Sequence, residues 1–224
     1  LIGTFINKSF EFVEIGRFWL NENPDTIPHA TDRGTTDKGF GNMNTYRAVL
    51  WAKLQIEDKL LFIFNSHYPL SGNNETRFKC SELEMNKIKE IAGDNPWISV
   101  GDKNIIPTKD DNDLYNPETV YEELTKNGKN IVQCGAEHKG IATTWIGFTY
   151  DEQKNNINTN GEFEDPIILD VIVSNLVSTS SFHHHGAFDP VELRLLQLSE
   201  ILPQEYNEQR YFASDHALIG ADVV

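Results

Sequence analysis

The sequence predicts a single α/β domain, and three observations lead to that prediction. Short apolar runs rich in β-branched and aromatic residues alternate with polar connections rich in Asn and Gly. Segments with helical periodicity separate several of these runs, which is the order of strand, helix and strand typical of α/β folds. The 224 residues are 39% hydrophobic, enough for one sizeable core, so one domain is expected to span residues 1–224.

Six apolar runs are predicted as strands. They cover residues 10–20, 46–55, 59–67, 97–102, 167–175 and 216–224. Residues 56–59 are expected to turn the chain between the second run and the third. Two of the last three runs are nearly continuous in hydrophobicity, which indicates strands covered on both faces.

Three segments are predicted as helices. Residues 75–92 place their apolar side chains on one face and most charges on the other. A shorter helix is expected at residues 116–128. Residues 189–202 begin with the capping residue Asp189 and carry Pro190 at the first helical position, which predicts a third helix.

Charge and cysteine content exclude several classes of protein. The chain carries 19 basic and 34 acidic residues, a net charge of −15, which argues against general coating of nucleic acid. A local groove that is cationic or holds a divalent ion can still bind a phosphate. Cys80 and Cys134 are too few for a disulfide framework. No apolar run is long enough for a transmembrane segment, and the compartment is left open.

Polar side chains that suit phosphate chemistry stand where four predicted strands end or pass the rim of the sheet. They are Asn65 and His67, Asp102 and Asn104, Asp170, and the pair Asp215 and His216. In α/β sheets the strand ends form the crevice where ligands bind. Carboxylates bind hard divalent cations, and a His beside an Asp can stay protonated to hold a phosphate. The set therefore favours hydrolysis of a phosphate ester.

Most of these residues also have a purely structural interpretation. His67 can be a core histidine bonded to the backbone, and Asp102 and Asn104 can cap a turn after their strand. The pair before the last strand can belong to a loop. Asp170 is harder to explain in this way, because a carboxylate in an apolar strand is costly unless it is paired.

Six segments resemble the motifs of a known superfamily in order and approximate spacing. FNSHYPL, VGDKN, TTWIGF, ILDVIVSN and SDHALIGADV resemble motifs of the endonuclease/exonuclease/phosphatase superfamily, the deoxyribonuclease-I-like fold. GRFWLNENPD is similar to a segment of its bacterial members. The match covers nearly the whole chain and implies a four-layer α/β sandwich, in which two packed mixed β-sheets are flanked by helices.

The resemblance implies roles for the residues around the phosphate. His67 contacts the scissile phosphate, Asp102 orients or deprotonates the attacking water, and Asn104 donates a hydrogen bond to the phosphoryl group. Arg47 and Arg77 stand where the bacterial subgroup carries arginines. These two are expected either to bind substrate phosphate or to serve in packing and salt bridges.

The resemblance also implies a metal ion. Asp215 is expected to be a metal ligand, while Asp170 pairs with His216 and keeps it charged. The expected ion is Mg²⁺, which Mn²⁺ can often replace. The expected reaction is attack of water on a phosphodiester or phosphomonoester. Nucleic acids, nucleotides, inositol phosphates and phospholipid head groups are the substrate classes left open.

The start of the sequence departs from the superfamily pattern. Superfamily members begin with a strand carrying an Asn and a second strand ending in Gln-Glu, whose Glu is the principal metal ligand, whereas this sequence opens at LIGTFINKSFEF. The domain is therefore expected to be incomplete at its N-terminus, and monomeric when complete. Two hypotheses follow, a metal-dependent hydrolase whose ligand lies on a further segment, and a catalytically inactive scaffold acting as a binding or regulatory module.

Two further positions are unusual. Lys103 stands where the superfamily usually has Phe, and side-chain alternation turns it away from the site. A Lys there has to reach solvent or find a carboxylate. His183, His184 and His185 are interpreted as a solvated turn, with a substrate-facing loop or a metal site as alternatives.

Overall fold

The computed structural model describes part of the chain, and its contacts divide the chain into two compact units. The described residues are 4, 6–28, 39–40, 46–70, 74–105, 115–130, 138–139, 169–184, 188–189, 194–195 and 218–223. The first unit is Leu1–Asn130 with Asp170–Val177, and the second is Ile131–Leu169 with Ser178–Val224. The single domain over residues 1–224 stays a prediction.

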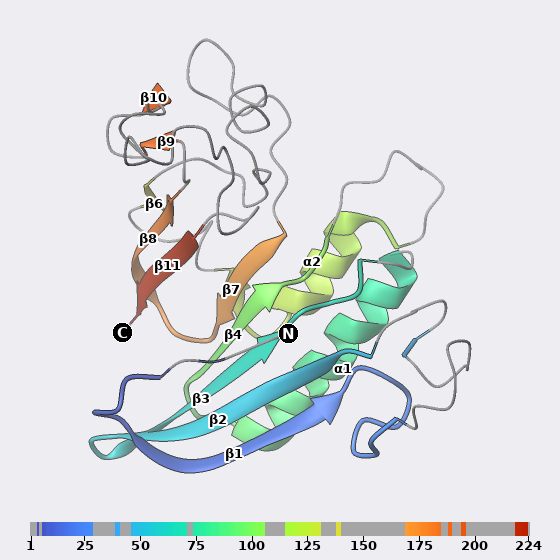
Figure 1. Ribbon diagram of the computed structural model, residues 1–224, viewed down its shortest axis with the longest axis horizontal. Helices are drawn as coiled ribbons and strands as arrows, with labels where there is room; N and C mark the ends of the chain where they lie inside the picture. Colours follow the sequence, from blue (N-terminus) through green and yellow to red (C-terminus); the bar gives the residue numbers. More distant parts are fainter. Residues whose placement is uncertain are drawn as a thin grey trace, which may run out of the picture. The chain divides into compact units, whose positions relative to one another are not determined.

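A six-stranded mixed sheet forms the centre of the first unit (Figure 1). Its strands lie in the order β1 (Glu11–Trp19), β2 (Ala48–Ile56), β3 (Lys59–Ser66), β4 (Trp97–Asp102), β7 (Asp170–Ser174) and β5 (Lys129–Asn130). β3 and β4 run parallel, while the other neighbouring strands are antiparallel. The predicted strands that fall in this unit are confirmed.

The turn between β2 and β3 is held by one side chain. Glu57 adopts a φ of 53° at this turn. Gln55 Nε2 donates to the carbonyl oxygen of Glu57 at 2.7 Å and to that of Lys59 at 3.2 Å. The turn expected at residues 56–59 is therefore confirmed, and it fixes the register of the two strands.

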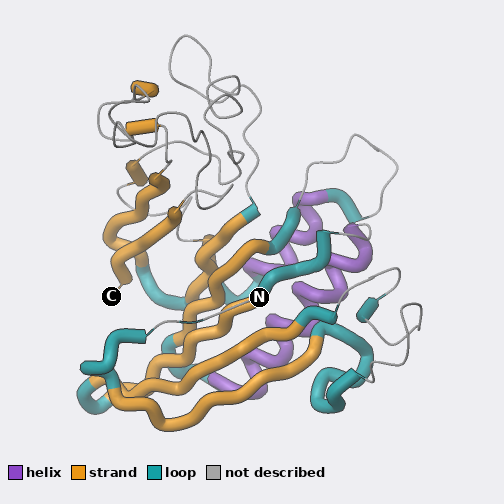
Figure 2. Tube along the Cα trace, viewed as in Figure 1, coloured by secondary structure: helices purple, strands orange, loops and turns teal. Residues whose placement is uncertain are grey.

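Two helices, α1 (Asn74–Ala92) and α2 (Pro117–Thr125), lie on one face of the sheet (Figure 2). Ser66 at the end of β3 donates to Glu84 of α1, so this face of β3 is the one that α1 covers. Alternation turns Phe62 and Phe64 to the same face, where both are buried. The core lies between sheet and helices, whose buried apolar side chains are Cys80, Met85, Ile88, Ala92, Val120 and Leu124. The α/β fold class and both helices are confirmed.

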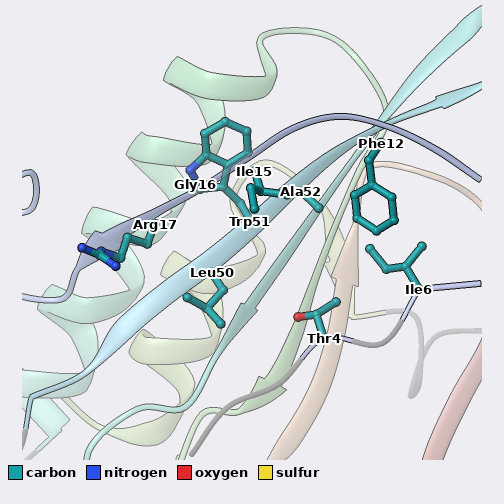
Figure 3. A pocket seen from close by; sticks show the side chains of 9 residues that line it. All are labelled: Thr4, Ile6, Phe12, Ile15, Gly16, Arg17, Leu50, Trp51 and Ala52. Carbon is teal, nitrogen blue, oxygen red and sulfur yellow. The ribbon is translucent and has the colours of Figure 1, made fainter. Parts of the chain in front are cut away.

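The strand at the edge of the sheet, β1, exposes apolar surface and borders a pocket. Phe12 is 51% exposed and Ile15 is 72% exposed. A pocket of about 580 Å³ is lined by β1, by residues 50–52 of β2 and by two residues that precede β1 (Figure 3). The Trp51 ring lies so close to Gly16 that an added Cβ there would come within 2.5 Å of it. None of the predicted site residues that the structure describes lines this pocket.

The described residues of the second unit form two small sheets. One has the order β11 (Leu218–Val223), β8 (Ser178–His184) and β6 (His138–Lys139), and the other pairs β9 (Phe188–Asp189) with β10 (Arg194–Leu195). The last predicted strand is confirmed as β11. How the sheets of the two units pack stays a prediction. No helix in the described part of the chain is long and apolar enough to cross a membrane.

Two expectations about the second unit are wrong for the residues described. Asp189 pairs with Arg194 in an antiparallel ladder, so these residues are extended and do not belong to the helix predicted at 189–202. The capping pattern is a local preference of about 1 kcal/mol, which strand pairing outweighs. His183 and His184 lie in β8 and pair with β11, whereas a solvated turn was expected. His185 lies outside the described residues.

The start of α2 provides a test of the local structure. Asn116 Oδ1 accepts a hydrogen bond from the backbone N–H of Thr119 at 2.8 Å, so Asn116 is the N-cap. Asn116→Ala is expected to lower the free energy of unfolding by about 1 kcal/mol, measured by urea denaturation. Glu82→Ala, at an exposed position inside α1, is the control and is expected to change the free energy of unfolding by less than about 0.5 kcal/mol. An equal loss in both variants would show that Asn116 has no capping role.

Candidate active site

His67 and Asp102 meet at the edge of the sheet that the ends of β3 and β4 form, because these two strands are parallel neighbours. His67 directly follows β3, and Asp102 is the last residue of β4. His67 Nε2 lies 3.3 Å from Asp102 Oδ2. The His67 side chain is 35% exposed and the Asp102 side chain 15%. The sequence interpretation of His67 as a core residue therefore does not hold, since the ring lies at a rim that solvent reaches.

The backbone after β4 forms a tight turn that orients the Asp102 carboxylate. Asp102 Oδ1 accepts from the N–H of Asn104 at 2.8 Å, and Asn104 has a φ of 49°. This is the turn-capping contact that was considered for Asp102. It uses one carboxylate oxygen, while the other faces His67. The carboxylate is thus held at both oxygens.

Asn104 ties the two strand ends together. Its Nδ2 donates to the carbonyl oxygen of Tyr68 at 2.9 Å, and the N–H of Tyr68 donates to the carbonyl oxygen of Asp102 at 2.8 Å. Asn104 is only 3% exposed. One of its two amide hydrogens is used in this contact, and the role of the other toward a phosphoryl oxygen stays a prediction.

Asp170 is brought to the same edge by the pairing of β4 with β7. Asp102 and Asp170 are direct partners in this antiparallel register, and directly opposite residues share a face of a sheet. Tyr121 of α2 lies near Asp170. Burial raises the pKa of Tyr121, and the negative charge of Asp170 adds to that shift. The structure therefore places two carboxylates side by side, an arrangement that nearby positive charge stabilises.

Two arginines supply positive charge near Asp102. Arg47 immediately precedes β2, and Arg77 lies in α1 with 4% of its surface exposed. Burial lowers the pKa of both guanidinium groups, and the Asp102 carboxylate opposes that shift in each. Arg77 Nη2 donates to the carbonyl oxygen of Leu70 at 2.8 Å, so part of this side chain holds the backbone. The buried Nε atoms of both arginines have no hydrogen-bond partner in the described part of the chain.

Lys103 has the carboxylate that its position requires. It points to the helix side of the sheet, where its Nζ lies 2.9 Å from Glu84 Oε1, and neither side chain is exposed. Burial lowers the pKa of Lys103, and Glu84 opposes that shift. The expectation of an acidic partner is confirmed. Sequence reasoning did not name Glu84, although it stands four residues from both Cys80 and Ile88 and therefore on the buried face of α1.

The remaining predicted residues lie outside the described part. Asp215 and His216 precede β11, and the structure places neither. The edge therefore brings together six of the eight predicted site residues, which are Arg47, His67, Arg77, Asp102, Asn104 and Asp170. The assignment of catalytic, metal-binding and substrate-binding roles among the eight stays a prediction.

A relative in sequence matches nearly the whole of this chain. No protein-family profile matches the sequence. An uncharacterized protein of Acanthamoeba polyphaga mimivirus is 35% identical over 231 residues, which cover 97% of this chain. The chain spans 32% of the length of that relative.

Solved structures identify the fold. The endonuclease/exonuclease/phosphatase from Bacteroides vulgatus matches with a TM-score of 0.65 and 25% identity, over 97% of this chain and 67% of that one. The chain has the endonuclease/exonuclease/phosphatase superfamily fold. The resemblance seen in the sequence motifs is confirmed.

Two other solved structures with the endonuclease/exonuclease/phosphatase fold belong to proteins named for different activities. The mannosyl-6-phosphatase of Bacteroides thetaiotaomicron matches with a TM-score of 0.62 and 18% identity, over 96% of this chain and 67% of that one. TDP2 of D. rerio, complexed with a single-strand DNA product, matches with a TM-score of 0.56 and 18% identity, over 96% and 69%. At these identities the likeness establishes the fold, and the substrate follows from the site.

Proposed function

We propose that this chain carries the catalytic edge of a divalent-metal-dependent phosphoesterase, which hydrolyses a phosphodiester or phosphomonoester by attack of water. The observation that carries the proposal is the convergence of His67, Asp102 and Asp170 at one sheet edge, with Arg47 and the buried Arg77 near Asp102. The superfamily fold, shared with a phosphatase and with a DNA-bound TDP2, supports the same class of reaction.

In the proposed reaction, Asp102 acts on the attacking water. Its Oδ1 is fixed by the turn, and its Oδ2 faces the rim beside His67. A carboxylate held in one orientation can align a water molecule for attack and accept its proton. His67, which is more exposed than Asp102, is positioned to pair with Asp102 when protonated and to reach a phosphoryl oxygen.

Arg47 and Arg77 suit recognition of the phosphate. Guanidinium groups bind phosphate through paired hydrogen bonds, and the buried Nε atom of each is a donor with no partner in the described residues. Arg77 is anchored to the backbone at Leu70, so its position is fixed before substrate binds. Positive charge at this edge offsets the repulsion that the acidic chain as a whole exerts on a phosphate.

The described residues supply only part of a metal site. They contain no group of three or more His, Cys, Asp or Glu side chains that could hold an ion, although Asp102 and Asp170 offer oxygen donors as register partners. The described residues alone therefore do not fit a complete Mg²⁺ site. We propose that Asp215 is a ligand together with groups beyond the described residues. A divalent ion bound there would neutralise charge on the phosphoryl oxygens.

Metal removal tests the proposed function. With Mg²⁺ or Mn²⁺ the protein is expected to turn over at least one member of a panel containing single-stranded DNA, sugar phosphates, inositol phosphates and phospholipid head groups. EDTA or Asp215→Ala is expected to lower kcat/KM by at least about 100-fold. Asp25→Ala, at an exposed surface position, is the control. Binding of a panel member without turnover at any metal concentration would instead support the inactive scaffold.

A further inference from the structure

The pair formed by Lys103 and Glu84 is fully buried and fully hydrogen-bonded. Lys103 Nζ contacts Glu84 Oε1 at 2.9 Å and Oε2 at 3.1 Å, and it also contacts Ser99 Oγ at 3.1 Å and Ser66 Oγ. The hydroxyls in turn donate to the carboxylate, Ser66 Oγ to Oε2 at 2.8 Å and Ser99 Oγ to Oε1 at 2.5 Å. The Tyr68 ring covers the ammonium group at 4.8 Å. A buried ion pair needs such complete satisfaction to be tolerated.

Among the described residues, those that contact this pair in or next to β3 and β4 lie one to three positions from a proposed site residue. Ser66 and Tyr68 flank His67, and Lys103 separates Asp102 from Asn104. Side-chain alternation turns the flanking residues to the helix side and leaves His67 and Asp102 on the rim. A displacement of Ser66, Tyr68 or Lys103 would therefore reach His67 or Asp102, whose side chains lie 3.3 Å apart, through one peptide unit.

Glu84 anchors the pair to helix α1, outside the sheet. It lies in the middle of α1, a 19-residue helix, and it is fully buried. Its carboxylate contacts β3 through Ser66 and β4 through Ser99 and Lys103. An apolar side chain at position 103 would fill the same space without prescribing an orientation, whereas a hydrogen-bonded charge pair prescribes both distance and direction.

We propose that Lys103 and Glu84 are positioning residues of the active site. The pair sets the separation and orientation of His67 and Asp102 from beneath the sheet, with Ser66 and Ser99 as its hydrogen-bonded supports. The inference rests on the proposed hydrolysis for its kinetic consequence. Its geometric consequence, the contact between His67 and Asp102, is independent of any activity.

The main test replaces both charges by apolar side chains. Lys103→Met combined with Glu84→Met removes the pair without leaving a buried charge, and such replacements often keep a protein folded. We expect kcat to fall by about 10- to 100-fold while KM changes by less than about twofold, because displacement of reacting groups by about 1 Å has effects of this size. The imidazole ¹H–¹⁵N signals of His67 are expected to shift toward those of an Asp102→Asn variant.

The control is a surface pair of the same kind. Lys79→Met with Glu75→Met removes an ion pair of 2.9 Å on the exposed side of α1, and it is expected to leave kcat and the His67 signals unchanged. Unchanged kcat and unchanged His67 signals in the buried double variant would overturn the positioning role. If the wild type turns over no substrate, the proposed function fails, and the His67 signals still decide the positioning.

A milder variant covers the case in which the double variant does not fold. Ser99→Ala removes one hydrogen-bond partner of the pair and keeps both charges. It is expected to lower kcat by about threefold and to shift the His67 signals in the same direction, because the direct contacts between Lys103 and Glu84 and the contacts of Ser66 remain. A folded Ser99→Ala protein with wild-type His67 signals and kcat would contradict the proposal.

Discussion

Gly101→Ala is expected to lower the free energy of unfolding by about 3–5 kcal/mol and to abolish any activity of the site. Gly101 precedes Asp102 and has a φ of 130°, which side-chain-bearing residues rarely adopt. A Cβ at this position would lie 1.9 Å from the carbonyl oxygen of Ser66. That atom belongs to the backbone of the neighbouring strand, so the clash can be relieved only by separating β3 from β4 at the site.

Gly93 provides the matched control for this prediction. It also has a positive φ, 62°, but a Cβ added there would have no neighbour within 4 Å. Gly93→Ala is expected to cost about 1–2 kcal/mol from backbone strain alone. Urea denaturation of the two variants separates strain from the steric clash. Equal costs would mean that β3 and β4 can separate freely, against the close approach seen at Gly101.

Asp102→Asn is expected to lower kcat by roughly 10²–10⁴-fold while the protein stays folded. Asparagine keeps the Oδ1 acceptor for the N–H of Asn104, so the turn is preserved. It removes the negative charge that faces His67. The same charge opposes the lowering of the Arg47 and Arg77 pKa by burial, so both guanidinium groups lose that electrostatic support. The effect on kcat is measured by steady-state kinetics with the substrate that the wild type hydrolyses fastest. Circular dichroism checks that the variant is folded.

Asp94→Asn is the control for this substitution. The Asp94 side chain is 96% exposed and pairs with Lys89 on the surface, so the same chemical change there is expected to leave kcat unaltered. A folded Asp102→Asn enzyme with more than about a tenth of wild-type kcat would show that Asp102 is a turn residue without a role in activating water.

Periodicity was enough to predict most elements of the first unit. β3, β4 and α1 keep their predicted places because apolar side chains recur at the strand or helix period and one face of each is buried. β1 and β2 also form where apolar runs were predicted, although most side chains of β1 are exposed. The segment after Asp189 has an equally good local pattern, yet its described residues pair as strands. Local preference is small beside the pairing and packing that the rest of the chain supplies.

The candidate site could be predicted only in part for a related reason. The polar ends of β3 and β4 are visible in the sequence, since they interrupt apolar runs. The partner of Lys103 was expected to be a carboxylate, but Glu84 lies on a helix whose packing against β3 and β4 no local pattern specifies. The strained backbone at Gly101 likewise depends on Ser66, a residue far away along the chain.

β3 and β4 are parallel strands that the chain connects through α1. This connection bears on the order in which the site can form. His67, Glu84, Lys103 and Asp102 are all encoded within one continuous segment, residues 59–105. Since chains emerge from the ribosome N-terminal end first, this segment is available to fold before β7 is made. Until β7 pairs, β4 has an open edge in the emerging chain. The pairing of β7 therefore covers that edge of β4 and, by the same contact, brings the second carboxylate, Asp170, opposite Asp102.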